Sequence, residues 1–163
     1  MGAKAPPYND ADSMKQVRKS VLLWYSAQEM YDLVTDVEAY PRFLPWCDSA
    51  RVVARHDDGV TARIGLHYLG LRHAFTTRNI EDPGRKVRIE LVDGPFSRLD
   101  GEWRFVSLGQ AQAQGDACKI EFDLRYAFAS GALQRIVSPV FDRIANTFVD
   151  AFVKRAESVY GRR

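Results

Sequence analysis

The sequence predicts an α+β fold in which a curved antiparallel sheet wraps around one long C-terminal helix. Segments of alternating apolar and polar residues follow one another through the middle of the chain, separated by short turns that contain glycine. This pattern is typical of antiparallel strands. The last part of the chain instead carries apolar residues at helical spacing, and it is the only segment long enough to cover one face of the sheet.

The composition fits one globular domain. The chain has 163 residues, 46% of them hydrophobic and 27% charged, with a formal net charge of +2. Nucleic-acid-binding domains are usually strongly basic, so we expect no DNA partner. Residues 1–13 are small, polar and proline-bearing, which predicts a disordered tail before one domain over residues 14–161, with Met14 as a candidate natural start. The isolated Cys47 and Cys118 predict free thiols.

A strand and a short helix come first. Residues alternate from Val17 to Trp24, which predicts a strand. Ser26 then opens a Ser-Ala-Gln-Glu capping box that ends at Glu29. Apolar residues at helical spacing extend the predicted helix over Ala27–Val37.

The next segment, Pro41–Cys47, combines large apolar side chains with two prolines four residues apart. The prolines forbid a long regular helix, while the apolar groups need cover. The segment is therefore either a lid over one mouth of a cleft or a plug in the core. The lid candidates are Pro41, Phe43, Leu44, Pro45 and Trp46.

Further strands fill the middle of the chain, and glycine marks the turns between them. The predicted strands lie near Ser49–His56, Val60–Tyr68, Leu71–Glu81, Lys86–Val92, Leu99–Leu108 and Ala117–Phe128. Asp57-Asp58-Gly59 and Leu69-Gly70 are predicted hairpin turns. Asp82-Pro83-Gly84 suits a three-residue loop with Gly84 left-handed. That loop would place Asn79 opposite Val87, Thr77 opposite Ile89 and Phe75 opposite Leu91.

The chain ends in a predicted helix over Pro139–Val159, with Ser138-Pro139 as its cap and first turn. Phe141, Ile144, Phe148 and Phe152 should face the sheet. Asp142, Arg143, Asp150, Lys154 and Glu157 should face solvent. A curved sheet around one helix generally leaves a cleft between them, and this cleft is the expected binding site.

Motifs for catalysis are missing from the sequence. It contains no glycine-rich phosphate loop, no HExxH and no GxSxG. The Leu69-Gly70 turn would put His67 and His73 on opposite faces, so they could not share a metal ion. We therefore predict no catalytic residue, no metal site and no required cofactor, and we expect a protein that is not an enzyme.

The inner faces of the strands and the helix supply the candidate ligand site. Expected apolar walls are Phe75, Leu91, Trp103, Phe105, Phe141, Ile144 and Phe148. Inward-facing polar residues are Tyr68, His73, Thr77, Asn79 and Tyr126. A buried polar group needs a partner. These residues therefore either satisfy one another and the backbone or hold the polar head of a ligand.

The outer faces carry arginines, which leaves a surface for ribosomal RNA as an alternative. They are Arg63, Arg72, Arg78, Arg88, Arg104 and Arg125. Acidic residues such as Glu90, Glu102 and Asp123 are interleaved with them, which favours an ordinary solvated surface.

Four stretches resemble one known family. They are Tyr40-Pro-Arg-Phe-Leu-Pro-Trp-Cys47, Ser26-Ala-Gln-Glu-Met-Tyr-Asp-Leu-Val34, Gly94-Pro-Phe with Leu99-Asp-Gly-Glu-Trp-Arg-Phe105, and Phe148–Ala156 with Tyr160-Gly161. Together they resemble the coenzyme Q-binding START-domain family, also called polyketide cyclase-like, which includes bacterial ribosome association toxins. The resemblance covers residues 14–161.

This resemblance implies the helix-grip fold of START and Bet v 1-like proteins, with a hydrophobic tunnel. It implies ubiquinone as the bound ligand, in support of respiration. For the toxin members it implies binding to the large ribosomal subunit and a block of subunit association. A polyketide cyclase or aromatase is a third alternative. We expect a bacterial cytoplasmic protein that makes transient contact with the inner membrane.

Overall fold

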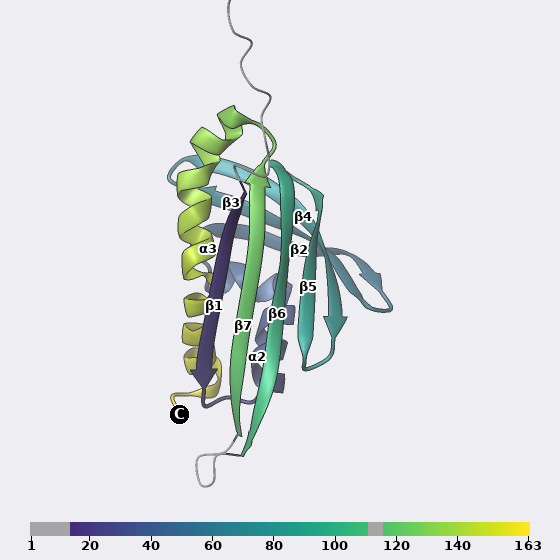
Figure 1. Ribbon diagram of the computed structural model, residues 1–163, viewed down its shortest axis with the longest axis vertical. Coiled ribbons are helices and arrows are strands. Elements are labelled where there is room, and N and C mark those ends of the chain that lie inside the picture. Colours follow the sequence, from purple (N-terminus) through teal and green to yellow (C-terminus); the bar gives the residue numbers. More distant parts are fainter. Residues whose placement is uncertain (1–13, 111–115) are drawn as a thin grey trace, which may run out of the picture.

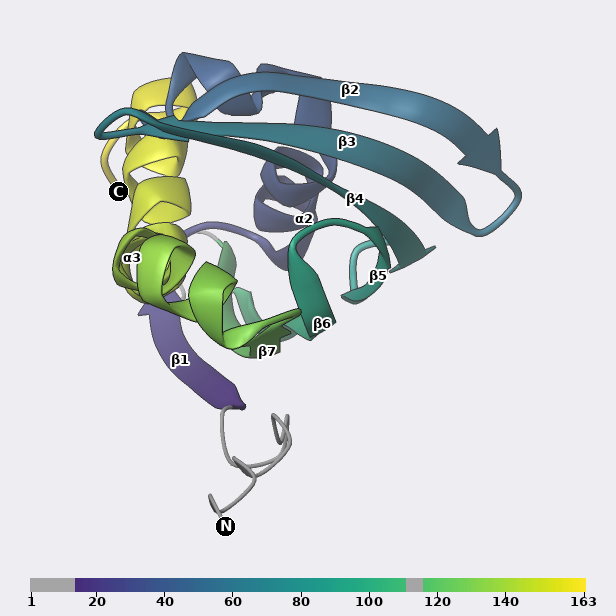
Figure 2. The ribbon, with the colours of Figure 1, turned by 90° about the horizontal axis from the view of Figure 1, so that it is seen from above.

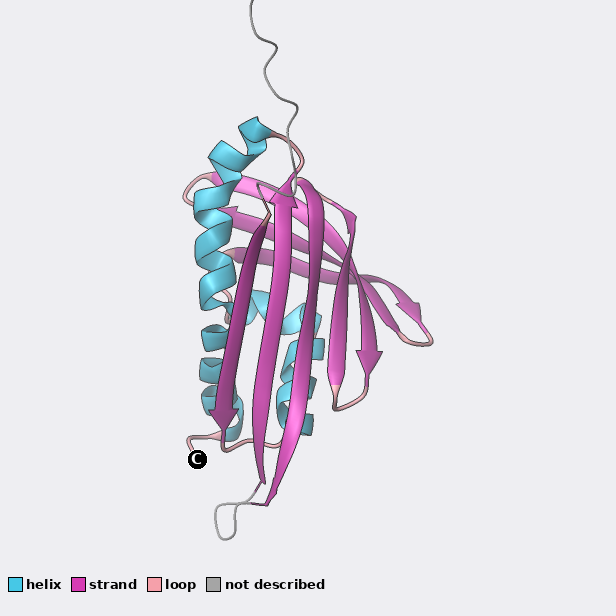
Figure 3. Ribbon diagram, viewed as in Figure 1, coloured by secondary structure: helices cyan, strands magenta, loops and turns pink. Residues whose placement is uncertain are grey.

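The computed structural model describes residues 14–110 and 116–163, and these form one curved antiparallel sheet with its helices on the concave side (Figures 1 and 3). The elements follow in the order β1 (Lys15–Leu23), α2 (Ala27–Thr35), the 3-10 helix η1 (Val37–Arg42), β2 (Cys47–His56), β3 (Gly59–Tyr68), β4 (Leu71–Asp82), β5 (Lys86–Asp93), β6 (Phe96–Gln110), β7 (Asp116–Phe128) and α3 (Gly131–Tyr160). The predicted tail at residues 1–13 lies outside the described residues.

The seven strands pair in the order β1-β7-β6-β5-β4-β3-β2, and every pair is antiparallel. Figure 2 looks down on the sheet and shows it curled into a U, with α3 across the open side and α2 inside the curve. The fold class predicted from the sequence is confirmed.

The first helix forms as the capping pattern predicts. The Ser26 hydroxyl accepts a hydrogen bond from the Glu29 amide at 3.0 Å, and the Glu29 carboxylate accepts one from the Ser26 amide at 2.9 Å. The helix ends at Thr35, two residues earlier than predicted, and η1 follows with Pro41 inside it. A 3-10 turn tolerates this proline because it is short and needs few backbone donors.

The turn between β4 and β5 has three residues, as predicted, but it consists of residues 83–85. Asn79 therefore pairs with Ile89 and Thr77 with Leu91, so the predicted register is wrong by two residues. Gly84 is left-handed, with φ +72°, and the Arg85 amide donates to the Asp82 carbonyl at 3.0 Å. A shift of two residues keeps every side chain on its predicted face because the side-chain period of a strand is two.

The terminal helix begins eight residues before its predicted start. Its N-cap is Ser130, whose hydroxyl accepts from the Leu133 amide at 3.1 Å. Ser138 is buried within the helix and is not its cap. Pro139 lies inside α3, where it lacks a backbone donor and crowds the preceding turn. The first turns of α3 lean away from the rest of the helix in Figure 1.

Candidate functional site

An apolar cavity of about 80 Å³ lies between the sheet and α3. Its wall takes residues from α2, η1, five strands and α3. Of the predicted apolar wall, Phe75, Trp103, Phe141, Ile144 and Phe148 line it. Other lining residues include Tyr40, Trp46, Ile64, Val87, Leu99, Phe122, Leu124 and Ala145. The cavity is smaller than the ~300–1,000 Å³ typical of sites for drug-sized ligands, so a ligand larger than a single ring must displace side chains.

Two predicted wall residues lie outside the cavity. Phe105 is buried, but it packs behind Trp103, with ring centroids 6.1 Å apart, and against Tyr31 at 5.7 Å. Leu91 is only partly buried and packs on the core without lining the cavity. Both face inward as predicted. The cavity occupies only part of the inner face, because aromatic side chains fill the rest.

Thr77 and Asn79 are the polar candidates that line the cavity. The Thr77 hydroxyl donates to Asn79 Oδ1 at 2.9 Å, and Thr77 is 4% exposed. This bond satisfies the hydroxyl and leaves the Asn79 amide nitrogen as the donor available to a ligand oxygen. The two residues are i and i+2 on β4, so their side chains share a face.

The other three polar candidates lie away from the cavity. Tyr68 and His73 are half-buried near the end of the sheet at the β3–β4 turn, beyond Phe75. The Tyr126 hydroxyl donates to Asp142 Oδ1 at 2.5 Å, and burial followed by this hydrogen bond raises the pKa of Tyr126. The structure therefore separates Tyr126 from the two residues that could meet a ligand's head.

Asp142 is a hydrogen-bonded residue whose position the sequence pattern predicted wrongly. It was predicted to face solvent on α3, yet its carboxylate receives Tyr126 and also lies 2.5 Å from the Lys15 ammonium. Lys15 donates to the Ser138 hydroxyl as well, at 2.5 Å. The cluster ties β1, β7 and α3 together at one end of the helix. The sequence did contain one sign of this cluster. Tyr126 was predicted to face inward, and a buried hydroxyl needs a hydrogen-bond partner such as Asp142.

The segment Pro41–Cys47 packs as part of the core. Leu44 is 1% exposed and Trp46 is 7% exposed, and backbone hydrogen bonds join Cys47 to Leu44 and His67 to Trp46. Pro41 and Pro45 are exposed, and Phe43 is half-buried beneath the Arg155 guanidinium at 5.1 Å. Of the two alternatives, this packing fits a plug better than a lid.

The cavity wall carries few groups that could act as an acid, a base or a nucleophile. Within residues 14–110 and 116–163, its lining contains no carboxylate, imidazole, amine or thiol. The Tyr40 hydroxyl is already donated to the Val34 carbonyl, and burial raises its pKa. Near the cavity, burial raises the pKa of the Cys47 thiol to about 11, so it is not a thiolate nucleophile at neutral pH. The arrangement is suited to apolar binding with one amide donor.

Groups of three or more histidine, cysteine or acidic side chains placed to hold a metal ion are absent from the part of the chain that the structure describes. Across the same residues, no helix combines the length and apolar character needed to cross a bilayer.

Residues 23–153 match the family described as polyketide cyclase / dehydrase and lipid transport. A ribosome association toxin, RatA, from Pseudomonas aeruginosa is 39% identical over 145 residues, which cover 89% of this chain and 97% of that protein. The mitochondrial coenzyme Q-binding protein COQ10 homolog B of Xenopus laevis is 30% identical over 89% of this chain and 59% of its own length.

Among solved structures, the aromatase/cyclase Zhui from Streptomyces sp. R1128 superposes with a TM-score of 0.74. The match covers 92% of this chain and 99% of that protein, at 17% identity. A likeness at this identity concerns the fold. The matches named as a toxin and as a coenzyme Q-binding protein share more sequence with this chain, at 39% and 30% identity.

Proposed function

This chain belongs to the polyketide cyclase / dehydrase and lipid transport family, and from that premise we propose that it binds a hydrophobic lipid with a ring headgroup, of the quinone class. The observation that carries the proposal is the largely aromatic and aliphatic cavity between the sheet and α3, whose wall includes the hydrogen-bonded pair Thr77 and Asn79. A relative is named as a coenzyme Q-binding protein. The chain acts here as a carrier or chaperone and not as an enzyme.

The energetics of such a site are simple. Each buried CH₂ of a ligand contributes roughly 0.8 kcal/mol, so an apolar ligand can bind tightly with little polar chemistry. The Asn79 amide can donate to one quinone carbonyl, which contributes about 1 kcal/mol and orients the ring. Because the cavity holds about 80 Å³, it accommodates the ring, and the tail extends beyond it.

Titration with a short-tailed ubiquinone should quench tryptophan fluorescence in a saturable way, because Trp46 and Trp103 both line the cavity. Trp24 is 44% exposed and away from it, so a Trp24→Phe background removes its signal. In that background, Asn79→Leu should weaken binding by about fivefold, because the loss of an amide donor worth about 1 kcal/mol changes Kd by about that factor. Linear, unsaturable quenching in the Trp24→Phe protein would contradict the proposal.

A second candidate function is association with the large ribosomal subunit, as the names of several relatives suggest. The specific observation is a pair of exposed arginines, Arg51 and Arg63, placed directly opposite each other on β2 and β3. Like charges opposite each other destabilise a sheet. Neither forms a salt bridge with any described residue, so a polyanionic partner would relieve this repulsion.

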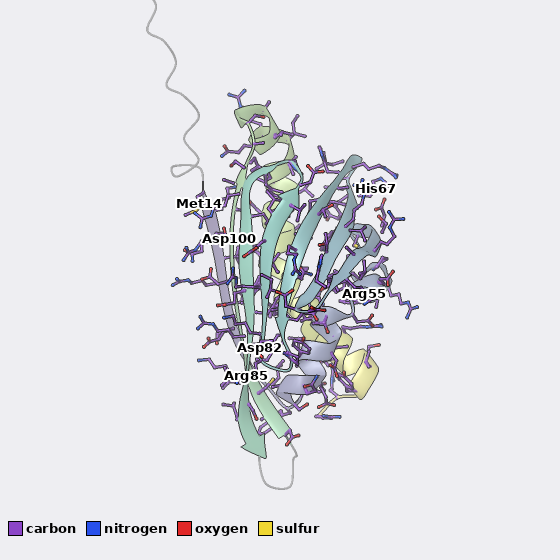
Figure 4. All side chains as sticks on the ribbon, turned by 90° about the vertical axis from the view of Figure 1, so that its right-hand side faces the viewer. Met14, Arg55, His67, Asp82, Arg85 and Asp100 are labelled. Atoms are coloured by element: carbon purple, nitrogen blue, oxygen red, sulfur yellow. The ribbon has the colours of Figure 1, made fainter. Side chains whose placement is uncertain are left out.

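The arginine pair sits on the outer surface of the β2–β3 hairpin. Figure 4 faces this side of the molecule, with His67 and Arg55 labelled near the two ends of the hairpin. His67 and Arg72 are neighbours farther along the same surface, with Arg72 Nη2 and His67 Nδ1 3.4 Å apart. On β6 the outer arginines are paired, Arg98 with Asp100 and Arg104 with Glu102.

Reversing both charges, in Arg51→Glu with Arg63→Glu, should reduce co-sedimentation with large ribosomal subunits by at least about tenfold, because phosphate contacts dominate such binding. The matched control is Arg98→Glu with Arg104→Glu, which changes the same charge on β6. Added salt should weaken the wild-type interaction. Equal pelleting of the two double variants would count against this surface.

A further inference from the structure

Glu81 is a partly buried acidic residue beside the cavity. It stands two residues after Asn79 on β4, so Thr77, Asn79 and Glu81 face the same side of the sheet. On β5, the residue paired directly with Glu81 is Val87, which lines the cavity. Within the described part of the chain, no salt bridge involves Glu81. Its carboxylate therefore has no ionic partner among these residues.

Tyr31 on α2 holds the Glu81 carboxylate in place. The helix lies inside the curve of the sheet (Figure 2), and the Tyr31 hydroxyl donates a hydrogen bond to Glu81. The Tyr31 ring is itself buried and packs edge-on against Phe105. Burial raises the pKa of Glu81, although the charge of Arg55 and the Tyr31 hydrogen bond act against this rise. A carboxylate can accept about four hydrogen bonds, so Glu81 keeps acceptor positions for a ligand.

A polar hollow of about 240 Å³ adjoins the cavity on the side of Glu81. Val37 lines both spaces, and Val60 in the hollow pairs directly with Asn79 in the cavity. The charged residues that line the hollow are Asp36, Glu38, Arg55 and Glu81. With the cavity of about 80 Å³, the hollow reaches the lower end of the ~300–1,000 Å³ of typical ligand sites. A ring that moves the Val37 side chain can therefore extend from Asn79 towards Glu81.

The two polar side chains along this path differ in the hydrogen bonds that they can make. The Asn79 amide nitrogen donates, whereas an ionised Glu81 carboxylate only accepts. The oxygens of a quinone also only accept, so they can bond to Asn79 but are repelled by Glu81. The hydroxyl groups of the reduced form, the quinol, can donate as well as accept. The quinol can therefore satisfy both side chains, and the quinone can satisfy only one.

We propose that Glu81 makes the site selective for the reduced, hydroxyl-bearing form of its quinone-class ligand. This inference rests on the proposed lipid-binding function and adds the redox state of the ligand. One hydroxyl oxygen of the quinol accepts a hydrogen bond from the Asn79 amide, and the other hydroxyl donates to the Glu81 carboxylate. The ring between them lies against Val37. Tyr31 is a positioning residue, because it acts on the ligand only through Glu81.

The test compares the Kd of a short-tailed ubiquinone with that of its quinol, by equilibrium dialysis in the absence of oxygen. Wild-type protein should bind the quinol at least about tenfold more tightly, as expected for one hydrogen bond to a charged group. Glu81→Gln keeps the shape of the side chain but removes its charge, so the variant should bind the two forms about equally. The control Glu90→Gln makes the same change on the outer face of β5, where Arg88 bridges Glu90, and should keep the wild-type preference.

Should Glu81→Gln fold poorly, Tyr31→Phe removes only the hydroxyl that orients the carboxylate and should lower the preference for the quinol. Equal binding of the two forms by wild type, or a full preference in either variant, overturns the inference. A wild-type preference for the quinone also overturns it, because Glu81 is then protonated and donates. In these cases saturable binding remains and the lipid-binding function stands. If neither form binds saturably to wild type, the lipid-binding function fails and the inference fails with it.

Discussion

Replacing Phe152 by alanine should lower the free energy of unfolding by about 3–5 kcal/mol, as expected for a fully buried phenylalanine. Phe152 has no exposed surface. Its ring lies 5.2 Å from Phe43, 5.3 Å from Trp103 and 5.4 Å from Tyr40, measured between ring centroids. It therefore joins α3, the sheet and the proline-rich segment in one aromatic cluster. Urea unfolding followed by circular dichroism measures the change.

Phe148→Ala is the matched comparison, one helical turn away. The sequence predicted that both residues face the sheet and that Phe148 is also a wall of the cavity. Phe148 is only partly buried and lines the cavity. Its removal should therefore destabilise the protein less than the removal of Phe152. An equal loss from both variants, or a loss below about 1 kcal/mol for Phe152→Ala, would contradict this account of the core.

The faces of the strands could be predicted from the sequence because they depend only on a period of two. In β7, Cys118, Ile120, Phe122, Leu124 and Tyr126 are buried as the alternation indicates. The register predicted for the β4–β5 hairpin was wrong by two residues. The predicted inward and outward faces were still correct, because only an odd shift exchanges them. The capping box of α2 was also readable, since all its partners lie within four residues.

The start of α3 and the role of Asp142 could not be predicted, because both depend on contacts between distant residues. A Ser-Pro pair is a good helix start by local rules, but here Ser138 is held by Lys15, which is 123 residues away in sequence. Asp142 is 127 residues from Lys15. Local periodicity places Asp142 on the polar side of the helix, and only the pairing of β1 with β7 brings the lysine to it.

The extent of the cavity could not be predicted from the sequence either. Alternation puts His73, Thr77 and Asn79 on the same face of β4, yet only Thr77 and Asn79 line the space. Where a cavity begins and ends depends on which aromatic rings close it. Here Phe75 and Phe141 meet at one end, and His73 lies beyond them. A contact between a strand and a helix more than sixty positions apart has no local signature.

Filling the cavity from α3 should weaken ligand binding strongly without unfolding the protein. Ala145 is 2% exposed and lines the cavity. Ala145→Leu adds three carbon atoms to a space of about 80 Å³. If those carbons displace an equal number from the ligand, the loss is ~2.4 kcal/mol at ~0.8 kcal/mol each, or about sixtyfold in Kd. Fluorescence titration with the short-tailed ubiquinone measures it.

The free energy of unfolding of Ala145→Leu should stay within about 1 kcal/mol of wild type, because the added atoms enter empty space and do not overpack a filled core. Ala151→Leu is the control: the residue is half-buried on the same helix and does not line the cavity, so its Kd should match that of wild type. Should Ala145→Leu fold poorly, Ala145→Val makes the same test with a smaller side chain. A folded, cavity-filled protein that still binds the quinone with wild-type affinity would place the ligand elsewhere and leave the cavity as a packing defect.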